Sequence, residues 1–314
     1  GLLCLKPSSE STIAVPLTNF TAKIVSELVE DDGAETRRLL EIETSMGGGT
    51  KRFTIPITQF SSMNWPMEHI GVGALVYPGF GLRDHARAAI QMLSTDIEER
   101  RVYTHIGWRQ VGGVWVYLHS GGAIGANGVV PNVDVALPVA LQRFEFPAPA
   151  EGLALTQAIR ASTQVLNLAR DSITFPMNCA IWRAAMGGVD ASEHLAGDTG
   201  GGKTELVALA QQHYGQGLDA RNLPGSWIST DNSLEGLAFA AKDALLVIDD
   251  FAPTGSHYDV QAMHRKADRV FRAQGNQAGR QRMKADATLR PPKPPRGLIL
   301  STGEDVPRGK SLRA

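Results

Sequence analysis

The segment HLAGDTGGGKTEL, at residues 194–206, places four glycines and a threonine ahead of a lysine. It contains the whole pattern GxxxxGK[ST], formed by Gly197, Asp198, Thr199, Gly200, Gly201, Gly202, Lys203 and Thr204. Glycine tolerates the backbone angles that turn successive N–H groups toward phosphate oxygens. In such a loop the lysine reaches the β- and γ-phosphates and the hydroxyl ligates Mg²⁺. The pattern predicts a site for ATP and Mg²⁺; the alternative is a flexible glycine loop at a helix start.

Two adjacent acids, Asp249 and Asp250, close the apolar run ALLVIDDF at residues 244–251. Ligand sites of parallel α/β sheets lie at the carboxyl ends of the strands. We therefore predict that Asp249 holds Mg²⁺, directly or through water, and that Asp250 polarises the attacking water as the general base. Asp250 is one methylene shorter than the glutamate of the commoner Asp-Glu pair. The alternative is an acidic strand end that faces solvent.

A second polar strand end, STGED at residues 301–305, follows the apolar run LIL. A polar side chain here is expected beside the acids that lie near the phosphates, where it senses the γ-phosphate. Thr302 is the preferred candidate, with Ser301 and Glu304 as competitors. A plain exit from strand to loop is the alternative.

The segment at residues 257–290 is basic, with eight lysines and arginines against three acids, a net charge of +5 in a chain whose formal charge is −1. Such clusters bind phosphate backbones. We predict nucleic-acid contacts from Arg265, Arg269, Arg272, Arg280, Arg282 and Lys284. A solvated helix face and a contact between subunits, with an arginine reaching a neighbour's nucleotide, are the alternatives.

The elements that position these residues change in type along the chain. Up to about residue 146 the pattern is that of short strands, with a hairpin around residues 31–35, a helix from about residue 84 and two strands joined at Gly112 and Gly113. From residue 151 helices and strands alternate, which is typical of a parallel α/β sheet. In the helix at residues 203–215, Leu206, Leu209 and Ala210 are expected on one face. The prolines at 147 and 149 mark the boundary.

The predicted architecture is therefore a β-rich α+β domain at residues 1–150 and an α/β P-loop NTPase domain at residues 151–314, with an AAA+ or RecA-like sheet. The second domain is expected to be truncated at its C-terminal end, and the chain to be a fragment of a larger protein. The β-rich half offers a weaker hypothesis, a base-stacking surface formed by Trp65, Trp108 and Trp115. Core positions are the commoner role of aromatic residues in strands.

Composition limits the alternatives. The chain has 314 residues, of which 43% are hydrophobic and 20% charged, an ordinary globular composition that is long enough for two cores. Two cysteines cannot form a disulfide framework, and no cysteine or histidine spacing predicts a structural metal site. No apolar run approaches the roughly 20 residues that a membrane span needs. We expect a cytoplasmic protein without a membrane partner.

These motifs together resemble a known family. GWRQVGGVWVYLHSGGAIG, GDTGGGKT, STDNSLEGLAFAAKDALLVIDDF and LILSTGE follow one another as in domain of unknown function 927, from about residue 15 to the end of the chain. That family is a P-loop domain of phage, plasmid and mobile-element proteins, often joined to a primase or described as a helicase. The ordered combination is more specific than the glycine loop alone.

The resemblance implies a helicase-like ATPase related to ring-forming AAA+ and superfamily 3 enzymes. Lys203 and Thr204 match its Walker A motif, Asp249 its Walker B metal ligand and Thr302 its sensor region. Asp-Glu-Leu is usual in the family where this chain has Asp-Asp-Phe. The family's sheet continues into an arginine-bearing stretch, in which Arg308 and Arg313 are candidates for an arginine finger.

The leading hypothesis is a DNA helicase or translocase that hydrolyses ATP with Mg²⁺ in mobile-element or phage DNA replication. Its expected partners are single-stranded DNA, further copies of the chain in a ring, with a hexamer as one form, and a fused or separate primase. One alternative is a P-loop ATPase that loads or remodels protein partners. Another is a module that binds nucleotide without hydrolysing it.

Overall fold

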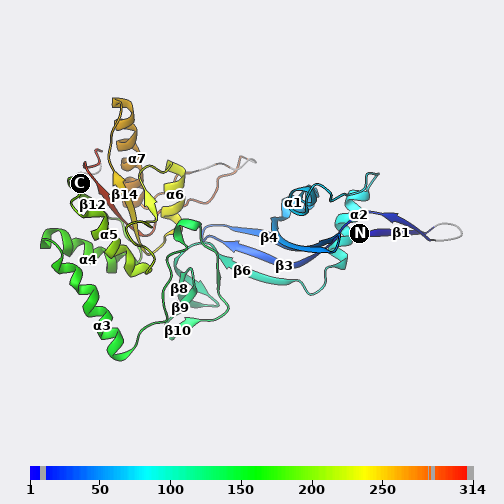
Figure 1. Cartoon of the computed structure of the whole chain (residues 1–314), viewed down its shortest axis with the longest axis horizontal. Helices are drawn as coiled ribbons and strands as arrows, with labels where there is room; N and C mark the ends of the chain where they lie inside the picture. Colours follow the sequence, from blue (N-terminus) through cyan, green and yellow to red (C-terminus); the bar gives the residue numbers. More distant parts are fainter. Residues whose placement is uncertain (8–11, 282, 284–286, 310–314) are drawn as a thin grey trace. The chain divides into compact units, whose positions relative to one another are not determined.

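The computed structural model describes residues 1–7, 12–281, 283 and 287–309 (Figure 1). The chain forms two compact units. The first comprises Gly1–Asp31 and Thr36–Val102, and the second comprises Asp32–Glu35 and Tyr103–Ala314. Both mix helices with strands. Within the described part of the chain, every helix is too short or too polar to span a lipid bilayer.

The first unit is the expected β-rich module. Its strands are β1 (Leu3–Pro7), β2 (Thr12–Pro16), β3 (Thr21–Asp31), β4 (Thr36–Met46), β5 (Gly49–Pro56) and β6 (Glu98–Tyr103). Its helices are α1 (Ile57–Ser62), the π-helical turn η1 (Pro66–Ile70) and α2 (Leu82–Leu93). Strands β6, β3, β4 and β5 are neighbours in this order, and the predicted hairpin is the antiparallel pair β3–β4.

Trp65 is a core residue of this first unit, so the hypothesis of a three-tryptophan stacking surface is wrong for this residue. Its side chain is fully buried. The rings of Phe20, Phe53 and Phe60 surround it, with centroids 5.8, 5.7 and 6.4 Å away. An indole enclosed by apolar rings stabilises the core and offers no face to a base.

The second unit contains an antiparallel and a parallel sheet. Its strands are β7 (Gly107–Val111), β8 (Val114–His119), β9 (Gly122–Gly125), β10 (Gly128–Val130), β11 (Asp134–Val135), β12 (Ser192–Ala196), β13 (Gly225–Ser226), β14 (Leu245–Phe251) and β15 (Leu298–Gly303). Its α-helices are α3 (Gly152–Thr163), α4 (Asp171–Ala185), α5 (Lys203–Gln211), α6 (Asp231–Ala240) and α7 (His257–Gly275). Its 3₁₀ turns are η2 (Val139–Leu141), η3 (Gln164–Asn167) and η4 (Gln212–Tyr214). The antiparallel order is β10-β9-β8-β7 and the parallel order is β12-β15-β14-β13.

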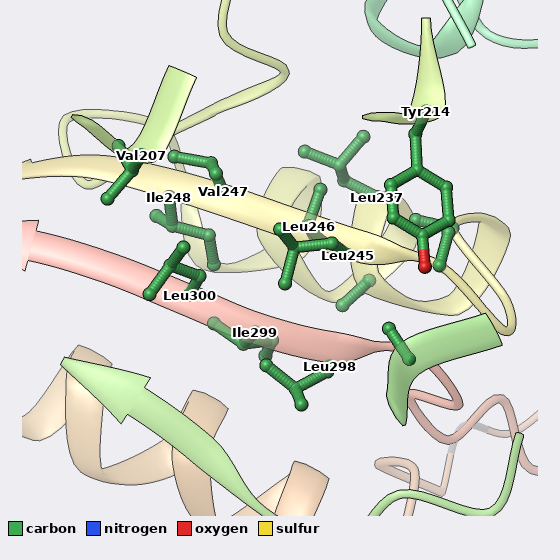
Figure 2. Close-up of a cluster of buried hydrophobic side chains, with 14 of the residues drawn as sticks. Val207, Tyr214, Leu237, Leu245, Leu246, Val247, Ile248, Leu298, Ile299 and Leu300 are labelled. Atoms are coloured by element: carbon green, nitrogen blue, oxygen red, sulfur yellow. The ribbon is translucent and has the colours of Figure 1, made fainter. Parts of the chain in front are cut away.

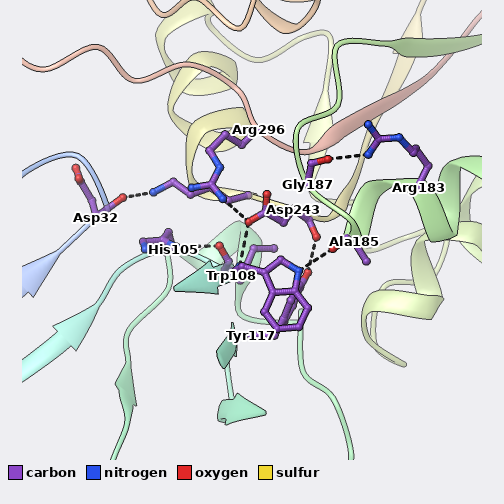
Figure 3. Close-up of polar contacts among 11 residues, drawn as sticks. Asp32, His105, Trp108, Tyr117, Arg183, Ala185, Gly187, Asp243 and Arg296 are labelled. Atoms are coloured by element: carbon purple, nitrogen blue, oxygen red, sulfur yellow. Dashed lines mark hydrogen bonds and ion pairs between the residues drawn. The ribbon is translucent and has the colours of Figure 1, made fainter. Parts of the chain in front are cut away.

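The β7–β8 hairpin belongs to the second unit, although the sequence placed the domain boundary at residue 150. Its two-residue turn has positive φ at Gly112 and Gly113, as predicted for a primed turn. Trp108 donates its backbone N–H to the carboxylate of Asp243 at 3.0 Å and its indole N–H to the Ala185 carbonyl at 2.7 Å (Figure 3). These contacts cross more than 70 residues of sequence, so a composition shift at the prolines cannot reveal them.

Asp243 makes several of the contacts that attach the β7–β8 hairpin to the rest of the second unit. Its carboxylate is fully buried and pairs with the guanidinium of Arg296 at 2.6 Å, while its carbonyl accepts the hydroxyl of Tyr117 at 2.8 Å. Figure 3 shows these groups converging from the hairpin and from the segments that lead into β14 and β15. Because a buried carboxylate without partners is costly, these contacts determine where the hairpin attaches.

The parallel sheet holds the main core of the second unit. Helices α4 and α5 pack on it together, while α7 contacts β12 and β15 and lies beside α6. Strands β14 and β15 supply an unbroken apolar run, Leu245–Ile248 against Leu298–Leu300, which helix residues such as Val207 and Leu237 cover (Figure 2). Strands buried on both faces read as continuous hydrophobic runs, which is why their positions were predictable.

Helix α4 begins at Asp171 and contains Pro176. One local prediction for this unit needs correction, the apolar face of α5. In α5 the buried positions include Val207, Ala210 and Gln211, and Leu209 is 42% exposed. A rotation of 100° per residue turns Leu209 away from the sheet.

Strand β13 has only two residues, Gly225 and Ser226. It pairs with the end of β14 at Ile248 and Asp249. Gln211 of α5 supplies the hydrogen bonds for the beginning of β14. Its side-chain amide donates to the Leu245 carbonyl at 2.9 Å and accepts the Val247 N–H at 2.8 Å. One buried glutamine thus replaces part of a neighbouring strand.

We expect Gln211→Leu to lower the free energy of unfolding by about 2–4 kcal/mol, because the change leaves two buried backbone groups without partners. The matched control is Gln212→Leu at the adjacent position, whose amide makes only a 3.5 Å contact. Urea denaturation measures both. Equal midpoints for the two variants would contradict the role given to Gln211.

Candidate functional site

The glycine loop joins the end of β12 to the start of α5. Gly200 and Gly202 have φ of +79° and +76°, the left-handed region in which a side chain is strained. Gly202 is the N-cap of α5, and its carbonyl accepts the Leu206 N–H at 3.0 Å. The loop therefore presents the positive end of the α5 dipole at the carboxyl edge of the sheet.

Lys203 folds back over this loop. Its ammonium donates to the carbonyls of Gly197 and Asp198, both at 2.7 Å. The cation is thereby held at the mouth of the loop. The glycine pattern and the lysine, predicted as one motif, lie together.

Thr204 and Asp249 meet across the edge of the sheet. The Thr204 hydroxyl lies 3.2 and 3.4 Å from the two carboxylate oxygens of Asp249, which comes from the end of β14. The Thr302 hydroxyl, from β15, also donates to Asp249 and accepts the Asp250 N–H at 3.2 Å. Three oxygen-bearing side chains from three different elements therefore converge beside the loop.

Asp250 occupies a bulge in β14. Its φ is +67°, and the pairing with β15 shifts register between Ile248 and Phe251. The extra residue leaves the Asp250 side chain exposed and returns Phe251 to the core. The bulge is how two consecutive acids can follow one buried strand without burying both charges.

The three sensor candidates on STGED separate in space. Thr302 contacts Asp249, as described above. Glu304 accepts a hydrogen bond from the hydroxyl of Thr199 in the glycine loop. Ser301 instead contacts Trp227 and His194, at 2.8 and 3.0 Å. Alternation along β15 directs consecutive side chains to opposite faces of the sheet, so Ser301 points away from the side chains gathered at Asp249.

His194, in β12 before the glycine loop, belongs to a chain of hydrogen bonds that the sequence did not predict. His194 Nε2 lies 3.0 Å from the Asp305 carbonyl, an acceptor, so this nitrogen carries the proton. His194 Nδ1 then accepts the Ser301 hydroxyl, whose oxygen accepts the indole N–H of Trp227. Burial lowers the pKa of His194 below its ordinary 6.5, against a smaller opposing effect of Asp305.

The candidate arginine fingers lie beyond β15. Arg308 pairs with Asp305 at 3.2 Å, and its backbone N–H donates to His264 Nδ1 at 3.2 Å. Arg313 lies outside the described residues. No described contact joins Arg308 to the glycine loop.

Four of the six predicted nucleic-acid residues line a groove of about 750 Å³, which α6, α7, residues 276–280 and residues 290–295 form. Arg265, Arg269, Arg272 and Arg280 line it, while Arg282 and Lys284 lie outside the described residues. Arg290 and Lys293 add charge, and Phe239, Pro291 and Pro295 add apolar surface. Lys293 was not predicted, because the prolines on both sides of it are typical of a linker.

Acids of the same unit partly neutralise the groove. Arg269 forms an ion pair with Asp231, and Arg272 pairs with Asp268 at 3.4 Å. Arg265 lies over the ring of Tyr258, 5.6 Å from its centroid. These arginines are about half exposed where they pair, so their charges still face solvent.

Residues 186–293 match the model of a domain of unknown function (DUF927). The resemblance is confirmed for this segment, which contains the glycine loop and β14. The GW hairpin and the STGED strand lie outside the match.

One similar solved structure is named "SCCmec type IV Cch - active helicase". It shares 14% sequence identity and a TM-score of 0.49, and the match covers 96% of this chain and 53% of that chain. The chain thus spans about half the length of that protein. No curated protein matches it.

Stability is expected to fall as the pH drops below about 6.5. His194, His119 and His264 have pKa values lowered mainly by burial, so the unfolded chain binds protons more readily than the native one. The stabilisation is present above the unfolded pKa and is lost as the pH falls through it, by up to about 1.4 kcal/mol per pH unit for each group.

His194→Gln retains a donor and an acceptor but does not titrate. We expect urea midpoints to fall less in this variant than in the wild type between about pH 7.5 and 5.5. Identical pH profiles would contradict the assignment of a lowered pKa to His194.

Proposed function

We propose that this chain binds ATP with Mg²⁺ at the glycine loop and hydrolyses it to drive movement on DNA. The observation that carries the proposal is the meeting of Lys203, Thr204, Asp249 and Thr302 at one edge of the parallel sheet. The loop amides, the α5 dipole and Lys203 would receive the phosphates. The fold proposed for the second unit is that of a P-loop NTPase, of the AAA+ or RecA-like kind.

Thr204 and Asp249 fit a magnesium ion, since a hydroxyl and a carboxylate are the hard oxygen ligands that Mg²⁺ selects. When bound, the ion neutralises charge that develops on the transferred phosphoryl group. Thr302 orients the Asp249 carboxylate through its own hydrogen bond. The exposed Asp250 would take the proton of the attacking water, and its backbone is held by the same threonine.

The groove on α7 supports DNA as the partner. Arginines line it together with Phe239 and two prolines, a mixture of charge and apolar surface that suits the phosphates and bases of a single strand. Trp108 and Trp115, which are 37% and 60% exposed, remain candidates for stacking. Further copies of the chain in a ring, such as a hexamer, and a fused or separate primase complete the proposal, with Arg308 or Arg313 reaching a neighbour's nucleotide.

A protein partner is the second candidate function. The pairs Arg269–Asp231 and Arg272–Asp268 offer alternating charges, which suit a protein surface as well as a phosphate backbone. On this alternative the chain is an ATPase that loads or remodels proteins, and the groove arginines serve contacts between subunits.

Lys203→Ala should weaken binding of a fluorescent ATP analogue by about 100-fold, or about 2.7 kcal/mol, because the phosphates lose their cation. Asp249→Asn should retain nucleotide but lower turnover and raise the Mg²⁺ concentration that half-maximal turnover requires. Lys6→Ala, an exposed lysine of the first unit, is the control. Wild-type affinity in Lys203→Ala would refute the nucleotide site. A wild type that binds ATP without turnover would instead indicate a non-hydrolysing module.

Arg265→Ala and Arg280→Ala should each weaken binding of a single-stranded oligonucleotide and reduce the slope of log affinity against log salt by about 0.7. Arg221→Ala, at an exposed position away from the groove, is the control. Fluorescence anisotropy across a salt series measures the slope. Unchanged slopes together with altered oligomer mass would favour the protein-partner alternative.

A further inference from the structure

The segment that follows β15, residues 303–308, contacts the glycine loop at one end. The Gly303 carbonyl accepts the Gly197 N–H at 3.2 Å, and the Glu304 carboxylate accepts the hydroxyl of Thr199. The Glu304 backbone is fixed in turn, because its N–H donates to the Phe251 carbonyl at 3.0 Å. Only the side chain of Glu304 is therefore free to change partner without moving the end of the sheet.

The other end of the segment contacts α7. Arg308 donates its backbone N–H to His264, a residue of α7 that is only 8% exposed. The guanidinium of Arg308 forms an ion pair with the carboxylate of Asp305, and the carbonyl of Asp305 accepts a hydrogen bond from His194. Arg265, the next residue along α7, lines the groove. The five residues 304–308 thus contact the glycine loop at one end and the groove helix at the other.

A triphosphate bound at the loop would compete with the carboxylate of Glu304 for the hydroxyl of Thr199. The Thr199 hydroxyl has a single proton to donate, and both competitors are anions, which repel each other across a few ångströms. A triphosphate on the loop therefore favours a second arrangement in which Glu304 has left Thr199. This exchange of one hydrogen bond is the two-state element that a coupling mechanism requires.

We propose that residues 304–308 couple the glycine loop to the groove, with Glu304 as the positioning residue that responds to bound nucleotide. Helix α7 is a continuous helix of 19 residues that a capping box at Ser256 and Asp259 begins. Displacement of Glu304 acts through Asp305 and Arg308 on His264, and so turns or shifts the groove arginines as one body. The inference rests on the proposed function, since it needs both a nucleotide and a nucleic-acid ligand.

The test measures a coupling factor, the ratio of single-stranded oligonucleotide affinities with and without a non-hydrolysable ATP analogue. For the wild type we expect a factor of about 5 or more, equal when measured from either ligand. Glu304→Gln keeps the acceptor for Thr199 but removes the charge. It should bind the analogue at least as tightly as the wild type, with a coupling factor below about 2.

Asp305→Ala removes the ion pair with Arg308 at the other end of the segment and should also lose coupling while it keeps nucleotide affinity. Glu151→Gln, at an exposed position before α3, is the matched control and should keep the wild-type factor. A residue with a merely structural role would lower both affinities and leave their ratio unchanged.

The outcomes separate the two levels of the proposal. A wild-type coupling factor in both Glu304→Gln and Asp305→Ala, or no coupling in a wild type that binds both ligands, overturns the coupling role and leaves the proposed function standing. A wild type that binds no nucleotide overturns both. Loss of coupling in the two variants, with each separate affinity retained, supports the inference.

Discussion

The parallel pairing of β14 with β15 is the constraint on which the second unit depends. Leu245–Ile248 pair in register with Leu298–Ser301, so both strands end at the same edge of the sheet. That edge is where β12 also ends and the glycine loop begins. Asp249 and Thr302 are neighbours because their strands are neighbours, and Thr204 joins them because α5 starts from the loop that β12 carries to this edge.

Alternation along these strands divides polar side chains into two groups with different surroundings. Thr302 lies with Asp249, while Ser301 lies with His194 and Trp227 on the other side of the sheet. The bulge at Asp250 keeps the two groups apart at the end of β14, since it exposes one acid and buries Phe251. A regular strand would have sent Asp250 into the core and forced a charge to be buried.

The buried polar contacts that hold the unit together come from residues distant in sequence. Asp243 fixes the β7–β8 hairpin and Arg296, and Gln211 completes the edge of β14. Each satisfies backbone or charged groups that would otherwise be costly to bury. The hairpin therefore folds with the parallel sheet, although prolines 147 and 149 interrupt the chain between them.

The sequence by itself determined the glycine loop, the apolar strands β14 and β15, and most helices of the second unit, because local spacing encodes turns and periodicity encodes buried faces. Tertiary structure decided the unit to which the hairpin belongs, the burial of Trp65, the brevity of β13 and the separate partners of Ser301, Thr302 and Glu304. Most of these depend on contacts between residues that are far apart in the sequence, which no local pattern records. The groove is a further example. The sequence shows its arginines as a basic segment, but they line a groove only because α6 and the proline-rich segment lie against α7.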